Sequence, residues 1–303
     1  MSGILLGTAP ITWGVCEIPG WGEELPYQQV LAEMAAAGYT GTELGPWGYL
    51  PTDSPTLRRE LASHGLQLIG SFCPVTLHDP ARAPASLEQA THTARLLADL
   101  GSQVLVLADA GSAERLARAG RVRPEDGLAG DAWRRLAGGL ETLAGRVQAL
   151  GLRATFHPHA GTYVETAAEV DRLMELVPVG AIGLCLDTGH LAFGGADPVA
   201  VCKRYASRVW HVHAKDVRAS VLDAARRQEL DFPTAVGSGV CAPLGQGSVD
   251  FPALLAALRA VGYAGWLVVE QDIRLGPQWP AGGSPLENAR TSREYLERVM
   301  RNE

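Results

Sequence analysis

Eight short apolar runs alternate along the whole chain with longer amphipathic stretches, and this alternation limits the possible folds more than any other feature. The runs, rich in Val, Ile, Leu and Thr, lie at residues 4–9, 40–44, 66–72, 103–109, 153–159, 181–187, 208–214 and 265–271. Most are apolar nearly throughout, which is typical of parallel strands buried on both faces. The stretches at 26–37, 54–64, 86–100, 131–150, 165–177, 197–206, 250–261 and 285–301 predict helices. Strict alternation at about 38 residues per unit predicts an α/β fold, a single (β/α)8 TIM barrel.

The main alternative is an open, doubly wound sheet, which also alternates strands and helices. Such a sheet usually carries a Gly-rich phosphate turn after its first strand, and GTAPITWG at residues 7–14 contains no G-x-G-x-x-G. No linker rich in Pro, Gly and Ser divides the chain, so we expect one domain over residues 1–303. The longest irregular stretch, about 217–248, predicts a lid-like loop or, alternatively, a surface excursion.

Composition narrows the expected partners and compartment. The chain has 26 Lys and Arg against 33 Asp and Glu, a net charge of −7, so no basic footprint for nucleic acid or an anionic membrane is expected. The five cysteines form no C-x-x-C pair, unlike a disulfide framework or a zinc ribbon. The first residues do not resemble a signal peptide, and no apolar run reaches the roughly 20 residues of a membrane helix. We therefore expect a cytoplasmic protein; a homo-oligomer is compatible with the sequence.

Polar residues gather at the carboxyl ends of the predicted strands, where TIM barrels place their active sites. In chain order these are Trp13, Glu17, Glu43, Ser71, Cys73, Asp109, His157, His159, Asp187, His190, His211, His213, Lys215, Asp216, Glu270 and Asp272. Five of the eight histidines fall between residues 157 and 213. The other three, His64, His78 and His92, are interpreted as surface residues.

Aspartate, histidine and glutamate from separate strands suit a divalent ion such as Mn²⁺, Mg²⁺, Co²⁺ or Zn²⁺. Each residue alone has an ordinary explanation: a histidine that packs in the core, Asp187 as a helix cap, or Glu270 paired with an arginine. Four such residues at four strand ends favour one divalent metal ion as a cofactor.

Seven motifs run through nearly the whole chain: GTAPITWG (7–14), GTELG (41–45), FHPHAGTYVET (156–166), LDTGHLAFGG (186–195), RVWHVHAKDVR (208–218), GQGSVDF (245–251) and GWLVVEQD (265–272). Together, in this order and at barrel spacing, they resemble the xylose isomerase-like superfamily of sugar isomerases, epimerases and AP endonucleases, and within it the dehydratases of 2-keto-myo-inositol. This combination of motifs is specific. DTGH alone would indicate only the superfamily.

The resemblance implies roles for individual residues. Asp187, His213 and Glu270 match the superfamily's metal ligands at the ends of strands six to eight. The fifth-strand ligand is usually a glutamate, so either His157 replaces it, which we favour, or Glu165 reaches in from the next helix. The remaining implied groups are the catalytic Lys215, His159 and His190 and the substrate-binding Trp13, Glu43, His211 and Asp216.

The implied activity is a metal-dependent dehydration of a cyclic polyol ketone, a carbon–oxygen lyase reaction. One group would take the α-proton and another would protonate the departing β-hydroxyl, with Lys215 and His159 as candidates for either role. A lysine close to a bound cation would shift toward its neutral form. The alternative is a sugar or sugar-phosphate isomerase or epimerase that uses the same metal. A nuclease would need more early-strand histidines, and a binding-only barrel would not need acid and base groups.

Overall fold

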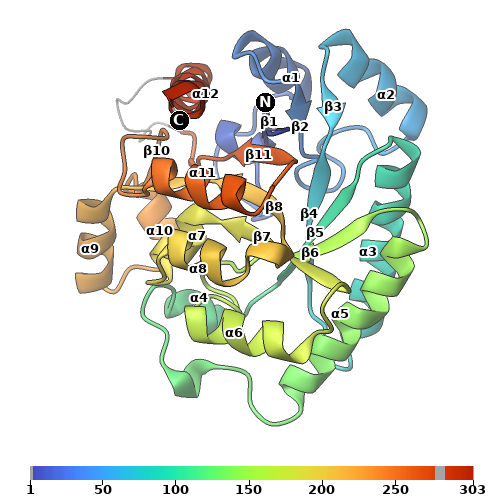
Figure 1. Ribbon diagram of the computed structural model, residues 1–303, viewed down its shortest axis with the longest axis vertical. Coiled ribbons are helices and arrows are strands. Elements are labelled where there is room, and N and C mark those ends of the chain that lie inside the picture. The colour runs from blue at the N-terminus through green and yellow to red at the C-terminus, as the bar shows by residue number, and fades with distance from the viewer. Residues whose placement is uncertain (1–2, 277–283, 303) are drawn as a thin grey trace.

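The computed structural model describes residues 3–276 and 284–302. Its main sheet has nine parallel strands in the order β3-β2-β1-β11-β8-β7-β6-β5-β4 (Figure 1). The strands are β1 (Leu5–Thr8), β2 (Gly41–Thr42), β3 (Gln67–Leu68), β4 (Gly70–Val75), β5 (Val104–Asp109), β6 (Arg153–Phe156), β7 (Ile182–Asp187), β8 (Val209–Ala214) and β11 (Trp266–Val269). Only Ile69 separates β3 from β4, so these two form one interrupted third strand that joins the two edges of the sheet. The predicted TIM barrel is confirmed.

All eight predicted helices are present, within a few residues of their expected ends. They are α1 (Tyr27–Ala36), α2 (Ser54–Ser63), α3 (Ala83–Asp99), α5 (Ala132–Gln148), α6 (Ala167–Leu176), α8 (Pro198–Arg204), α11 (Phe251–Ala260) and α12 (Pro285–Asn302). Local caps account for several of the starts. In α6, Thr166 and Glu169 form a capping box, in which each side chain accepts a hydrogen bond from the other's backbone N–H. Helix α12 packs against α1 and α11 and completes the helical ring (Figure 1).

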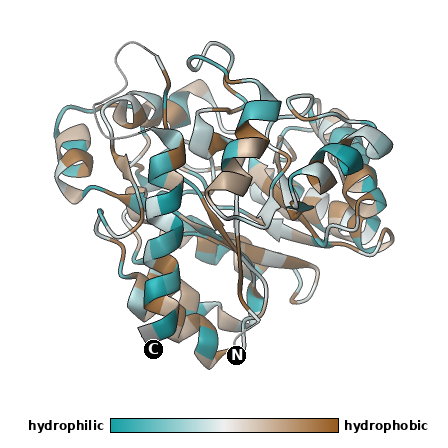
Figure 2. Ribbon diagram, turned by 90° about the horizontal axis from the view of Figure 1, so that it is seen from above, coloured by the Kyte–Doolittle hydropathy of each residue, from teal (hydrophilic) through white to brown (hydrophobic). Residues whose placement is uncertain are grey.

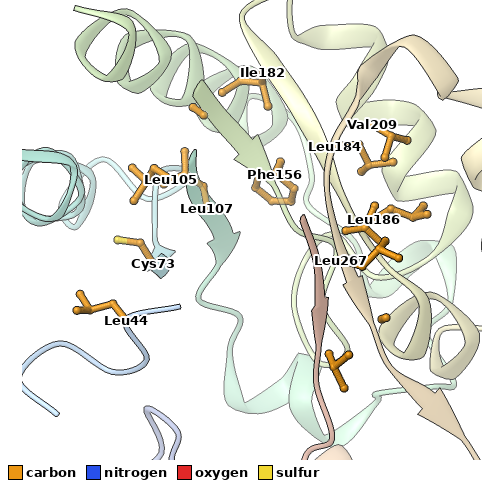
Figure 3. Close-up of a cluster of buried hydrophobic side chains, with 14 of the residues drawn as sticks. Leu44, Cys73, Leu105, Leu107, Phe156, Ile182, Leu184, Leu186, Val209 and Leu267 are labelled. Carbon is orange, nitrogen blue, oxygen red and sulfur yellow. The ribbon is translucent and has the colours of Figure 1, made fainter. Parts of the chain in front are cut away.

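Alternation along each strand separates two environments. One set of side chains, including Leu105, Leu107, Phe156, Leu184 and Leu186, belongs to the large core cluster shared with the helices (Figure 3). The other set fills the inside of the barrel, as in the small cluster of Val104, Val106 and Cys185. Figure 2 shows hydrophobic residues on the central strands and mixed residues on the surrounding helices. Because the strand period is two residues, Asp187 shares the inner face with Cys185.

The segment expected to be irregular contains regular structure instead. Between residues 217 and 248 lie α9 (Ala219–Arg227), α10 (Phe232–Gly237) and the short β10 (Cys241–Ala242), which pairs antiparallel with β9 (Asp216–Val217). Phe232 packs with Phe193, and Arg226 donates to the carbonyls of residues 192 and 193. The segment is therefore docked on the barrel mouth; its function as a lid stays a prediction.

The remaining elements are short. They are η1 (Pro10–Trp13), α4 (Ala113–Ala117), η2 (Pro124–Asp126), α7 (Thr188–Phe193) and η3 (Ala206–Arg208). No helix in the described ranges combines the length and apolarity required to cross a bilayer.

Candidate active site

A cavity of about 420 Å³ opens at the carboxyl ends of the barrel strands. Its charged and polar lining includes Glu17, Glu43, His157, His159, His190, His213, Lys215, Glu270 and Asp272. Apolar side chains, among them Ile11, Ile18, Phe72, Leu116 and Phe232, line much of the rest. Ligand sites in TIM barrels occur at this end of the barrel, so the cavity is the candidate active site.

Three of the four predicted metal ligands converge beneath this cavity. Asp187, His213 and Glu270 each offer a ligand atom within 4.8 Å of the other two, and all three are buried. The Nδ1 atom of His213 lies 3.3 Å from Oε2 of Glu270 and 3.7 Å from Oδ2 of Asp187. These side chains come from the ends of β7, β8 and β11, which are adjacent strands in the sheet. The strand ends therefore bring together the donor set that the sequence predicts.

Glu43 orients His213 from the opposite side of its ring. The Nε2 groups of His211 and His213 donate to Oε1 of Glu43 over 2.7 and 3.0 Å. Burial alone would raise the pKa of Glu43, but these two histidines hold it below its usual range. With Nε2 as the donor to Glu43, Nδ1 of His213 faces the carboxylates of Asp187 and Glu270. A ring N–H held by a carboxylate is the usual arrangement of a metal-binding histidine.

The buried nitrogens of the cluster support this fit. Nδ1 of His157 and Nδ1 of His213 are both buried and make no hydrogen bond within the described part of the chain. Buried polar atoms without a partner are rare in folded proteins, and a site that binds an ion is one of their ordinary explanations. Nδ1 of His213, together with the carboxylates of Asp187 and Glu270, forms a donor set suited to a divalent metal ion, and His157 meets Asp187 through its other nitrogen, Nε2.

The two carboxylate oxygens of Asp187 have different partners. Its Oδ1 accepts the backbone N–H of His190 over 2.7 Å and so caps α7, the role that the sequence allowed as a simple explanation. Its Oδ2 lies 3.2 Å from Nε2 of His157 and 3.5 Å from Nζ of Lys215. Burial would raise the pKa of Asp187, but Lys215 and His190 lower it well below its usual range. The cap therefore orients the carboxylate and leaves its second oxygen free for the site.

His157 and Glu165 have separate surroundings. His157 contacts Asp187, and its ring lies 5.0 Å from that of His213. Glu165 instead accepts the backbone N–H groups of Gly120 and Gly161 over 2.6 and 2.7 Å. Burial raises the pKa of Glu165 to about 7. His157, the favoured candidate for the fourth ligand, therefore contacts Asp187 of the metal cluster. Glu165 is instead hydrogen-bonded to two loops, at Gly120 and Gly161.

This arrangement yields a prediction for metal affinity. We expect His157→Ala to weaken divalent-ion binding at least about 10-fold, the usual size of losing a ligand or its support. Glu165→Gln keeps an acceptor for one of the two backbone N–H groups, and because Glu165 lies outside the cluster it should change metal affinity by less than about 3-fold, a small fraction of that loss. Titration of metal-free protein by calorimetry measures both. A larger effect at Glu165 than at His157 would contradict the assignment.

Lys215 lies among carboxylates and one histidine. Its Nζ is 2.6 Å from Oδ1 of Asp272, 3.2 Å from Oε2 of Glu270 and 3.0 Å from Nε2 of His190. Burial alone would lower the pKa of Lys215, but Asp187, Asp272 and Glu270 raise it well above its usual value. Without a bound cation these contacts favour the ammonium form of Lys215. The shift toward a neutral amine beside a bound cation stays a prediction.

His159 and His190 form a stacked pair beside Lys215, with ring centroids 3.7 Å apart. Nδ1 of His159 donates to the carbonyl of Ala160 over 2.8 Å, which leaves its Nε2 as an acceptor. Nδ1 of His190 accepts the N–H of Ala160 over 3.2 Å. Burial, followed by the charges of His157 and Lys215, lowers the pKa of His159 to about 3. His159 is therefore a neutral ring with a lone pair available to a ligand.

Of the four predicted substrate-binding residues, one lines the cavity and three do not. Glu43 lines the cavity, whereas Trp13, His211 and Asp216 are not among its lining residues. Trp13 is fully buried and donates through Nε1 to Glu33 over 2.7 Å. His211 supports Glu43 from inside the barrel. For Trp13, His211 and Asp216 the expected direct contact with substrate is therefore corrected to a supporting position.

Asp216 differs most from its predicted role in substrate binding. Its carboxylate accepts the backbone N–H groups of Gly245, Gly247 and Val249 at 2.8–3.0 Å. A Cβ atom on Gly247 would lie 2.2 Å from Oδ1 of Asp216, so only glycine fits there. The residue also makes no salt bridge to Lys215; that pairing belongs to Asp272. Asp216 therefore anchors the loop that precedes α11.

Because Asp216 anchors a loop and does not line the cavity, we expect its replacement to affect stability and not, directly, catalysis. We expect Asp216→Ala to lower the free energy of unfolding by about 3 kcal/mol, because several buried N–H donors lose a charged acceptor. Asp223→Ala, on the exposed side of α9, should change it by less than about 0.5 kcal/mol. Denaturant unfolding of the two variants measures the difference. Equal stability of the two would contradict the anchoring role.

The structure adds residues that the sequence did not assign to the site. Phe72 and Phe232 line the cavity, yet no local motif marks either of them. His78, interpreted as a surface residue, lies 2.9 Å from Asp109 through Nδ1 and is only partly exposed. Asp109 stands at a predicted strand end and could have suggested such a partner. The position of Phe232 depends on how α10 docks, which no local pattern reports.

Known proteins resemble the chain over nearly its full length. A family model described as xylose isomerase-like TIM barrel matches residues 31–299. The chain is 38% identical over 297 residues to an inosose dehydratase of Geobacillus kaustophilus, an alignment covering 97% of this chain and 94% of that protein. It is 40% identical over 296 residues to the rhizopine catabolism protein MocC of Rhizobium meliloti, covering 98% and 88%. An inosose dehydratase of Lacticaseibacillus casei is 35% identical over 298 residues, covering 98% and 97%.

Solved structures share the fold at lower identity. An L-ribulose 3-epimerase superposes with a TM-score of 0.70 at 19% identity, covering 99% of this chain and 96% of that one. The IOLI protein with a binding zinc atom gives 0.70 at 16% identity, covering 98% of both chains. At these identities the likeness shows the barrel alone, so the assignment rests on the family model and the sequence relatives. The chain belongs to the xylose isomerase-like TIM barrel family and, within it, to the group of the inosose dehydratases.

Proposed function

We propose that this protein is a metal-dependent carbon–oxygen lyase that removes water from a cyclic polyol ketone such as 2-keto-myo-inositol. The observation that carries the proposal is the Asp187–His213–Glu270 cluster, with Lys215 and His159 beside it on one cavity. The named function of relatives at 35% and 38% identity supports the same reaction. Those relatives are covered almost completely by this chain.

The metal would be held by Asp187, His213 and Glu270, with His157 as the fourth ligand. Mixed oxygen and nitrogen donors are compatible with Mn²⁺, Co²⁺, Mg²⁺ or Zn²⁺. The IOLI protein, a barrel of the same fold with a binding zinc atom, supports a divalent ion in this type of fold. When bound, the ion supplies Lewis acidity to the ketone oxygen and so acidifies the neighbouring C–H bond.

The side chains of this protein then divide the proton transfers. Nε2 of His159 has a free lone pair and is placed to accept the α-proton. Lys215, whose contacts with Asp272 and Glu270 favour the ammonium form, would donate a proton to the departing β-hydroxyl. That hydroxyl leaves as water, and a C=C bond forms between the α and β carbons. General acid–base assistance of this kind contributes about 10²–10⁴-fold.

An isomerase or epimerase with the same metal is the second candidate. Such a reaction moves a proton between two carbons and, in this superfamily, is understood to use two opposed carboxylates. Glu165, which could supply the second carboxylate, is bonded to Gly120 and Gly161 and does not line the cavity. This placement supports elimination over proton exchange.

Product analysis distinguishes the two reactions. Metal-loaded protein would be incubated with 2-keto-myo-inositol and with a panel of ketoses and ketose phosphates, and the products identified by NMR. We expect loss of one water from the inosose and no turnover of the ketoses. A product of unchanged mass would establish the isomerase or epimerase instead.

A further inference from the structure

One peptide group connects His159 to a carboxylate that lies outside the cavity. This peptide joins Ala160 to Gly161. Its carbonyl accepts the Nδ1–H of His159 over 2.8 Å, and its N–H donates to Oε2 of Glu165 over 2.7 Å. Because a carbonyl oxygen only accepts hydrogen bonds, the first bond requires the ring proton of neutral His159 to be on Nδ1. The ring and the carboxylate therefore bind the two ends of the same peptide.

The peptide is the middle of a tight turn. The N–H of Thr162 donates to the carbonyl of His159 over 3.2 Å, and Gly161 has a φ of +82°. A positive φ at this position is typical of a type II turn. Rotating the middle peptide by half a turn gives a type I turn, in which the Ala160 carbonyl would point away from Nδ1. The bond to Glu165 opposes that rotation, because the Gly161 N–H would lose its acceptor.

Glu165 is itself held firmly. Its Oε1 accepts the N–H of Gly120 over 2.6 Å, and its own backbone N–H donates to Oε2 of Glu169 over 3.0 Å. Glu169 is paired with Arg115 at 2.9 Å. Glu165 and Arg115 are both buried. The carboxylate of Glu165 is therefore a fixed acceptor that can orient the peptide.

Both bonds from backbone N–H groups require the ionised form of Glu165. Each oxygen accepts one N–H, whereas a protonated carboxyl carries a hydroxyl that has to donate. The charged groups that face this carboxylate are Arg115 on α4 and Glu169 on α6, and burial raises the pKa of Glu165 to about 7. Arg121 donates to two backbone carbonyls instead, and residues 191–195 carry no charge. Protonation near neutral pH therefore removes one of the two acceptors.

We propose that Glu165 is a positioning residue that fixes the tautomer of His159 through the Ala160–Gly161 peptide. With the peptide held in this way, Nδ1 of His159 carries the proton and Nε2 keeps its lone pair, as acceptance of the α-proton requires. The inference rests on the proposed function for the role of His159. It adds a residue that acts on the reaction from outside the cavity, since Glu165 is not among the residues that line it.

The test measures the tautomer of His159 in Zn²⁺-loaded protein from the NMR chemical shifts of its ring nitrogens. Absence of the signal in His159→Gln identifies the ring. Glu165→Met keeps most of the side-chain volume and removes both acceptor oxygens. We expect the ratio of the Nδ1–H to the Nε2–H form to fall at least about 10-fold in this variant, the effect of losing a hydrogen bond to a charged group.

Kinetics and a matched control separate positioning from a general loss of stability. In Glu165→Met, kcat for 2-keto-myo-inositol should fall at least about 10-fold while KM stays within about 3-fold, because the proton acceptor is affected and substrate binding is not. Asp216→Ala also removes a buried acceptor of backbone N–H groups, but at a loop that does not contact Gly161. It should leave the tautomer ratio of His159 unchanged.

The wild-type protein offers a measurement that needs no substitution. The pKa of His159 is lowered to about 3 by burial, so its ring stays neutral around pH 7. As the pH falls through about 7, protonation of Glu165 should reduce the Nδ1–H form of His159, and Glu165→Met should show no such step. An unchanged ratio in Glu165→Met, or a step that persists in it, would overturn the inference. If that variant does not fold, a constant wild-type ratio across pH 7 overturns it.

The tautomer is measured without turnover, which distinguishes failure of this inference from failure of the proposed function. Turnover of 2-keto-myo-inositol with a tautomer ratio that is indifferent to Glu165→Met overturns the positioning role alone. Absence of turnover, with the ratio still shifted by Glu165→Met, overturns the proposed reaction and supports the positioning role.

Discussion

Asp187→Ala is expected to abolish binding of the divalent ion and to lower kcat/KM by at least about 10³-fold, since Lewis-acid assistance contributes several kcal/mol. The residue is fully buried, and its Oδ2 is within 3.7 Å of His157, His213 and Lys215. Removing it leaves the lysine and the histidines without their central anion. Metal analysis of the purified variant and steady-state kinetics with 2-keto-myo-inositol measure the two effects.

The second function of Asp187 requires a matched variant. Asp187→Asn keeps an oxygen to cap α7 through the N–H of His190, so its fold should resemble that of the wild type while metal affinity still falls. Asp250→Asn makes the same change at the exposed cap of α11 and should leave metal binding intact. Chelation of the wild-type protein should reproduce the Asp187 defect, and readdition of Mn²⁺ or Zn²⁺ should reverse it. Full activity after exhaustive chelation would exclude the metal site.

Lys215→Met is expected to lower kcat by roughly 10²-fold or more while metal binding persists, the effect of losing a general acid. Methionine keeps most of the side-chain volume and removes the ammonium that pairs with Asp272 and Glu270. The geometry of the lysine also depends on Gly189, where a Cβ atom would lie 2.5 Å from Cγ of Lys215. The measurement is kcat together with bound metal per chain.

The control for this variant is Lys203→Met on the exposed face of α8, which should be indistinguishable from the wild type. Near-normal kcat in Lys215→Met would make the lysine structural. His159 or His190 would then have to supply the proton.

The barrel could be predicted from the sequence because its signals are local. Each strand is a short apolar run, each helix has its own periodicity, and strict alternation of the two permits few topologies. His213 and Lys215 are two residues apart at the end of β8, so strand alternation points both to one face, and both lie at the same Glu270 oxygen. The family motifs predict the candidate metal ligands for a related reason, since each candidate stands at the end of a strand.

What the sequence could not decide is which neighbour each polar group meets. Lys215 and Asp216 are adjacent in the chain, yet the lysine bonds Asp272 and the aspartate bonds the loop at Gly245–Val249. The positions of Trp13, behind the cavity wall, and of Phe232, on it, likewise follow from the docking of helices far away in the chain. The sequence by itself determined the barrel and the strand ends at which its chemistry lies. The tertiary structure alone decided the partners, because hydrogen bonds and ion pairs form between segments that only the closed barrel brings within 3–4 Å.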